Sequence, residues 1–134
     1  MKTFAVSDLH LSLAAPYEEA NPAAVLVRKP MNIFGGQWDD YFYRLAKNWR
    51  NTVADKDVVL IAGDISWAMT IEEARFDFTY LAALPGRKII SRGNHDYWWK
   101  GITKLRTALP QNIYALQHDA IDLGDFAVCA TRGW

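Results

Sequence analysis

Short apolar runs recur along the chain, and each is followed closely by glycine or a short polar residue. The runs cover residues 3–6, 58–62 and 88–91. Runs of this length with such boundaries are typical of buried strands, and helix-length segments separate them. The alternation predicts an α/β fold, in which a mixed sheet contains parallel βαβ units joined by right-handed crossovers.

Apolar residues spaced three and four apart predict the helices between these strands. Helices are expected at residues 38–53, 70–84 and 100–109. The second has the clearest boundaries, because Thr70 and Glu73 form a capping box and Pro85 follows its end. Further strands are expected at residues 113–117, 120–123 and 126–130, the last two as a hairpin around Gly124.

Four polar residues suited to metal binding follow the three apolar runs: Asp8, His10, Asp64 and Asn94. The carboxyl ends of parallel strands meet at one edge, where open α/β sheets place their sites. Asp8 and His10 stand two apart, so on an extended segment they would point to the same side. Oxygen ligands with imidazole suit divalent Mn, Fe, Co or Zn. Capping or turn formation would explain each residue alone, but not their recurrence at strand ends.

These residues form three motifs in a fixed order. They are Asp8-Leu9-His10, Gly63-Asp64 and Gly93-Asn94-His95-Asp96. In the order and composition of these motifs, the chain resembles the calcineurin-like metallophosphoesterases. The motifs of that family are DxH, GD, and GNH followed by Asp or Glu. The resemblance implies half of a four-layer α/β/β/α sandwich. It also implies a dinuclear metal-dependent phosphoesterase that hydrolyses phosphomonoesters or phosphodiesters, with metal-activated water as nucleophile.

The resemblance assigns a role to each motif residue. Two divalent ions are implied: Asp8 and His10 would hold the first, Asp64 would bridge both, and Asn94 would bind the second. His95 would face the leaving group as general acid or phosphate donor, since imidazole titrates near neutrality. Asp96 would fix the tautomer of His95.

One part of the family pattern is missing. Family members complete the metal site with a later histidine and a GHxH element, whereas the only histidine after His95 is His118, in Gln117-His118-Asp119. We therefore expect residues 1–134 to form a single, incomplete domain that is weakly active or inactive. Three possibilities stay open: a longer phosphoesterase, a non-catalytic metal-binding or protein-interaction module, and an active site shared between two chains.

Charge and hydropathy restrict the partners. Lys plus Arg and Asp plus Glu both number 15, so no basic field attracts nucleic acid or an anionic membrane. The expected partners are a small phosphorylated substrate and, through an uncovered sheet face, a second copy. The amino terminus lacks the apolar stretch of a signal peptide, so the cytoplasm is the expected compartment. Cys129 is expected to be a small buried residue.

Two further features leave alternatives open. The long segment 11–37 should border the metal site, and its Arg28 or Lys29 either contacts a phosphate or is solvated. Aromatic residues follow the second and third motifs, namely Trp67 and Tyr97-Trp98-Trp99. They either stack on an aromatic leaving group or pack in the core.

Overall fold

The computed structural model describes residues 1–133, which form two sheets and three α-helices. The main sheet has the strand order β1-β2-β3-β4, with β1 at Thr3–Val6, β2 at Val58–Ile61, β3 at Arg87–Ile90 and β4 at Ile113–Ala115. All its neighbouring strands are parallel. Strands β5 (Asp119–Asp122) and β6 (Ala127–Ala130) pair antiparallel in a second sheet. The α/β class with parallel βαβ units is confirmed, although the antiparallel pair stands apart from the parallel sheet.

The helices occupy the predicted segments with shorter boundaries. They are α1 (Tyr41–Thr52), α2 (Ile71–Ala82) and α3 (Ile102–Ala108). The loop before α1 contains the 3₁₀ turns η1 (Pro22–Ala24), η2 (Met31–Phe34) and η3 (Gly36–Trp38). At α2 the Thr70 hydroxyl accepts a hydrogen bond from Glu73 N–H (3.1 Å). The Glu73 carboxylate accepts from Met69 N–H (2.8 Å) rather than from Thr70 N–H, so only this second contact of the predicted box shifts by one residue.

The strand register aligns the carboxyl ends of the first three strands. Val6 lies beside Ile61, and Ile61 lies beside Ile90. Because the strands are parallel and end level with one another, the residues that follow them emerge at one edge of the sheet. This register is what brings the three motifs together.

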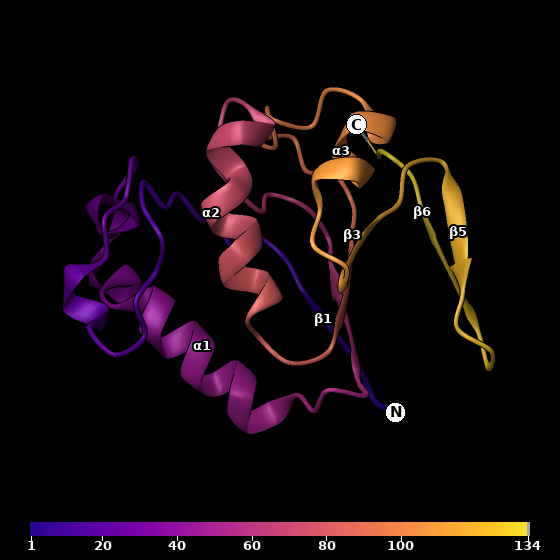
Figure 1. The fold of residues 1–134 in the computed structure, drawn as a ribbon, viewed down its shortest axis with the longest axis horizontal. Coiled ribbons are helices and arrows are strands. Elements are labelled where there is room, and N and C mark those ends of the chain that lie inside the picture. The colour runs from indigo at the N-terminus through magenta and orange to yellow at the C-terminus, as the bar shows by residue number, and fades with distance from the viewer. Residues whose placement is uncertain (134) are drawn as a thin grey trace.

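Helices cover one face of the parallel sheet, and the β5–β6 hairpin covers part of the other. Figure 1 shows α1 and α2 on the side opposite the hairpin. Val59 and Ile61 join the core formed with the helices, whereas Val58 and Ile89 pack with the hairpin side chains. The division follows from the alternation of side chains along a strand. These layers match the half of an α/β/β/α sandwich that the resemblance implies.

The hairpin also decides the environment of Cys129. In β6, Val128 and Ala130 pack toward the parallel sheet, and Cys129 points the other way and is exposed. The prediction of a buried cysteine was wrong, because β6 turns Val128 and Ala130, rather than Cys129, toward the parallel sheet. Among residues 1–133, no helix combines the length and apolar character needed to cross a membrane.

Candidate metal centre

Three of the predicted ligands meet at the carboxyl edge of the parallel sheet. Donor atoms of Asp8, His10 and Asp64 lie within 4.8 Å of one another. His10 Nε2 is 3.7 Å from Asp8 Oδ1 and 3.8 Å from Asp64 Oδ2. These separations are too long for hydrogen bonds. They suit ligands of one ion, because metal–ligand bonds of about 2.1 Å hold neighbouring donors about 3–4 Å apart.

The backbone takes an unusual conformation at each of these residues. Asp8, His10 and Asp64 have φ angles of 57°, 46° and 50°, in the left-handed region. Such conformations cost about 1–3 kcal/mol each and concentrate at functional sites. The segment from Asp8 to His10 is therefore not extended as predicted. Its two side chains converge through left-handed turns rather than through strand alternation.

Backbone hydrogen bonds hold the first motif against the second. Asp8 N–H donates to the Gly63 carbonyl (3.1 Å), and His10 N–H donates to the Asp64 carbonyl (2.9 Å). These bonds continue the pairing of β1 and β2 beyond the end of both strands. The ligand positions are thus fixed by main-chain contacts.

Glycine permits an equally close approach between the second and third motifs. A Cβ atom on Gly93 would overlap the amide nitrogen and carboxylate of Asp64. Asp64 Oδ1 accepts a hydrogen bond from His95 N–H (3.0 Å). Asn94 lies between these two contacts and is exposed. Its assignment as a ligand of a second ion stays a prediction.

The donor set itself fits a cation. Burial lowers the pKa of His10, against the opposing effect of the Asp64 and Asp8 carboxylates. A neutral imidazole is the form that binds metals. With its proton on Nδ1, a neutral His10 presents Nε2 as an acceptor beside the Asp8 and Asp64 carboxylates, and a divalent ion would fit between these three atoms. His10 Nδ1 is also buried and has no hydrogen-bond partner among the described residues.

Comparison with known proteins gives the family. The family model described as calcineurin-like phosphoesterase matches residues 1–131. This chain belongs to the calcineurin-like phosphoesterase family. The resemblance carried by the three motifs is therefore confirmed.

Two relatives share parts of this chain. An uncharacterized protein of Methanocaldococcus jannaschii is 40% identical over 52 residues, which are 39% of this chain and 28% of that protein. A crystal structure of a protein of unknown function from Aquifex aeolicus is similar with a TM-score of 0.48 and 21% identity, over 95% of this chain and 58% of that one. The chain thus spans less than two thirds of either relative.

In this phosphoesterase-family chain, His95 lies beside the three gathered donors. Its ring centroid is 6.0 Å from that of His10. Trp67 contacts both rings: it stacks on His10 at 4.8 Å and 22°, and it lies 4.8 Å from His95 at 50°. Trp98 and Trp99 are fully buried in the core. Of the aromatic residues after the motifs, Trp67 therefore lines the site, whereas the tryptophan pair serves packing.

Asp96 does not orient the His95 ring as predicted. It is fully buried, and its Oδ1 accepts hydrogen bonds from Ile65 N–H (2.8 Å) and Ser66 N–H (3.2 Å). Its Oδ2 accepts from Gly93 N–H (2.7 Å). The carboxylate therefore joins the loops after β2 and β3. The His95 ring instead has its Nδ1 3.2 Å from the Tyr97 hydroxyl.

Sequence reasoning missed the aromatic residues that precede and begin α1. Trp38 approaches His10 edge-on with ring centroids 6.3 Å apart. The Tyr41 hydroxyl donates to the His10 carbonyl (2.9 Å). A cavity of about 320 Å³ lies beside Asp8 and is lined in part by both aromatic residues. The long loop before α1 was the only sequence sign of such neighbours.

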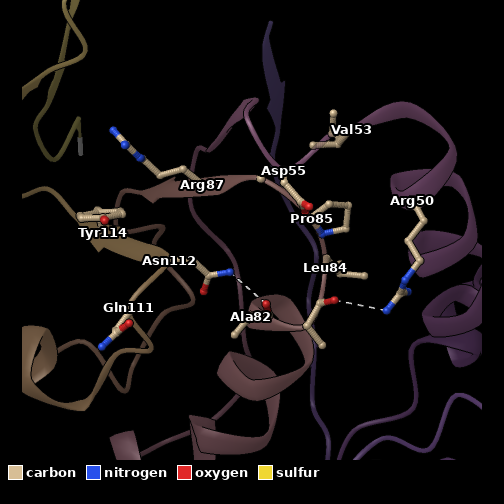
Figure 2. A pocket seen from close by; sticks show the side chains of 13 residues that line it. Arg50, Val53, Asp55, Ala82, Leu84, Pro85, Arg87, Gln111, Asn112 and Tyr114 are labelled. Carbon is tan, nitrogen blue, oxygen red and sulfur yellow. Dashed lines mark hydrogen bonds between the residues drawn. The ribbon is translucent and has the colours of Figure 1, made fainter. Parts of the chain in front are cut away.

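A cavity larger than the one beside Asp8 lies elsewhere, at the amino ends of the parallel strands. It measures about 960 Å³ and is shown in Figure 2. Two of its polar side chains serve the fold: Asn112 donates to the Ala82 carbonyl (2.9 Å), and Arg50 donates to the Ala83 carbonyl (3.3 Å). His118, on the hairpin, contacts the Thr131 hydroxyl (2.8 Å) and is not in the gathered donor group.

Proposed function

We propose that this chain contributes the Asp8–His10–Asp64 centre of a dinuclear, metal-dependent phosphoesterase that acts on phosphomonoesters or phosphodiesters. The main observation is the convergence of three metal-binding side chains on left-handed backbone at the carboxyl edge of the sheet. Membership of the family supports hydrolase activity and divalent metals in general. Together these favour phosphoester hydrolysis over a purely structural role for the centre.

The carboxylate of Asp64 would be shared by the two ions. Its Oδ2 faces His10, while its Oδ1 faces the backbone of His95 in the third motif. Asp8 and His10 would hold the first ion, and Asn94 the second. When bound, divalent ions such as Mn, Fe, Co or Zn acidify water and compensate the charge of the phosphoryl oxygens. Because these four residues are too few for two ions, we propose that further ligands come from residues beyond those described or from a second chain.

His95 is proposed to protonate the leaving group. The Tyr97 hydroxyl lies at Nδ1, which leaves Nε2 to hold a proton toward a substrate. Trp67 packs against the ring and limits its movement. A general acid of this kind contributes about 10²–10⁴-fold to the rate.

The test separates metal binding from proton transfer in the full-length protein, including any residues encoded beyond Trp134. Asp64→Asn should lose both hydrolysis and metal content. His95→Ala should retain its metal and turn over about 10²–10⁴-fold more slowly on an alkyl phosphate, a poor leaving group. Metal content is measured by elemental analysis alongside kcat.

A nitrophenyl phosphate provides the control, since its leaving group needs little protonation. On that substrate the His95→Ala defect should shrink. Equal metal loss in both variants would make His95 a ligand and overturn its role as acid. A full-length protein without metal-stimulated hydrolysis would overturn the proposed function.

A second candidate is a non-catalytic module that binds a partner, including a second copy, through the sheet. One observation favours it: on β1, Thr3 and Ala5 are exposed. Sedimentation of the 134-residue chain tests this candidate. A stable monomer at all concentrations would count against self-association.

A further inference from the structure

The loop between β1 and α1 carries Lys29 back to the metal centre. The Ser12 hydroxyl donates to the Lys29 carbonyl (2.8 Å), and Arg28 N–H donates to the Ser12 carbonyl (2.8 Å). Ser12 is fully buried and stands two residues after His10. The backbone of Lys29 is therefore fixed beside the segment that supplies the first ligands.

The side chain of Lys29 extends over Trp67. Its Nζ lies 3.3 Å from the centre of the indole ring, and the same ring stacks on His10 at 4.8 Å. Lys29 forms no ion pair with a carboxylate within residues 1–133. A cation–π contact thus holds a positive charge one aromatic ring away from the donors, without neutralising it.

The neighbouring Arg28 is engaged differently. Its guanidinium donates to the carbonyls of Leu13 (2.9 Å) and Glu73 (3.2 Å), and it lies 3.9 Å from the Asp77 carboxylate. These contacts fasten the loop to α2. Of these two basic residues, Lys29 lies at the site and forms no ion pair with a carboxylate in residues 1–133, whereas Arg28 lies near Asp77.

We propose that Lys29 contacts the phosphoryl group of the substrate and selects phosphomonoesters over phosphodiesters. The inference rests on the proposed function. Near pH 7 a monoester carries a charge of about −1.5 to −2, whereas a diester carries a single negative charge. A lysine ammonium binds phosphate as a point charge, and its attraction grows with the charge of the anion.

The principal variant is Lys29→Met, which keeps the apolar stem on Trp67 and removes the charge. A hydrogen bond to a charged group is worth about 10- to 100-fold in binding, so kcat/KM for an aryl phosphomonoester should fall by about that factor. Because the Coulomb energy is proportional to the charge, the loss for the matching diester should be about 3- to 10-fold. The monoester-to-diester ratio therefore falls.

Two variants serve as controls. Lys29→Arg keeps the charge and should preserve most of the ratio. Lys47 also lies over an aromatic ring, that of Tyr43, with its Nζ 5.9 Å from the ring centre. Lys47→Met removes this longer cation–π contact on α1 and should leave the ratio unchanged. A loss of the same size for both substrates in Lys29→Met would indicate a structural role and overturn the proposal.

Inorganic phosphate gives a readout that does not depend on turnover. Titrated calorimetrically at pH 8 with Mn present, phosphate should bind about 10- to 100-fold more weakly to Lys29→Met than to the wild type. Unchanged phosphate affinity overturns the assignment of Lys29 while leaving the proposed function intact. Conversely, Lys29-dependent phosphate binding without any hydrolysis by the wild type would count against the proposed function alone.

Discussion

Carboxylates at the two ends of the parallel sheet differ in their hydrogen bonding. At the amino end, the Asp57 carboxylate accepts backbone hydrogen bonds from Lys2 (2.7 Å) and Ala54 (2.9 Å). These bonds lower the pKa of Asp57. At the carboxyl end, Asp8 Oδ1 and Asp64 Oδ2 face His10 Nε2 across 3.7 Å and 3.8 Å, with no hydrogen bond between them.

The difference shows why cavity size is a poor guide to the site in this protein. The cavity of about 960 Å³ lies at the amino end, where Asn112 and Arg50 hydrogen-bond to the carbonyls of Ala82 and Ala83 (Figure 2). The carboxyl end instead concentrates acceptor atoms on left-handed backbone. Polar groups that the fold leaves facing one another identify a binding site better than volume does.

The largest expected effect concerns metal binding. The 134-residue chain should bind at most one divalent ion, and Asp64→Ala should abolish that binding. The reason is that Asp64 is one of the three donors gathered within the part of the chain that the structure describes. Isothermal titration with Mn or Zn measures the affinity. Asp57→Ala, at the opposite end, is the matched control and should leave it unchanged. Binding that survives Asp64→Ala would make Asp64 a turn residue.

A buried lysine on β3 gives the second prediction. Lys88 is fully buried and donates to the Leu84 carbonyl, and burial lowers its pKa to about 8. Its unfolded pKa is higher, so the unfolded chain binds more protons between about pH 8 and 10.5. Stability therefore rises with pH across this window.

Chemical denaturation of wild type and Lys88→Met measures this effect. Between pH 8 and 10.5, the free energy of unfolding of the wild type should rise by about 3 kcal/mol relative to that of the variant. Metal affinity at pH 7 should not change in that variant. If the stability difference between the two proteins does not change with pH, burial does not lower the pKa of Lys88. Water would then reach its ammonium group at the amino end of the sheet.

The third prediction tests the close approach of the motif loops. Gly93→Ala should destabilise the fold by about 2 kcal/mol and weaken metal binding, because its Cβ overlaps Asp64. Gly101→Ala is the control, since a Cβ there meets nothing within 4 Å. Urea unfolding of both variants measures the difference. Equal stability of the two would show that the loops can separate without cost.

Local patterns predicted most of the fold but not the conformation of the site. Strand ends and motif order were sufficient to bring Asp8, His10 and Asp64 together. The prediction that Asp8 to His10 is extended was wrong. The preference of Asp for left-handed backbone is too weak a local tendency to be recognised from the sequence. Asp96 was paired with its sequence neighbour His95, whereas its donors include Ile65 and Ser66 from the preceding loop.

Sequence alone determined the strands, the helices and the family motifs, because periodicity and capping act over a few residues. Tertiary structure decided which loop residues reach the candidate metal centre. Lys29 meets Trp67 only because the long loop is fastened to Ser12, and Cys129 is exposed only because the hairpin packs through its other face. Such contacts depend on how distant segments pack, and no local pattern records that packing.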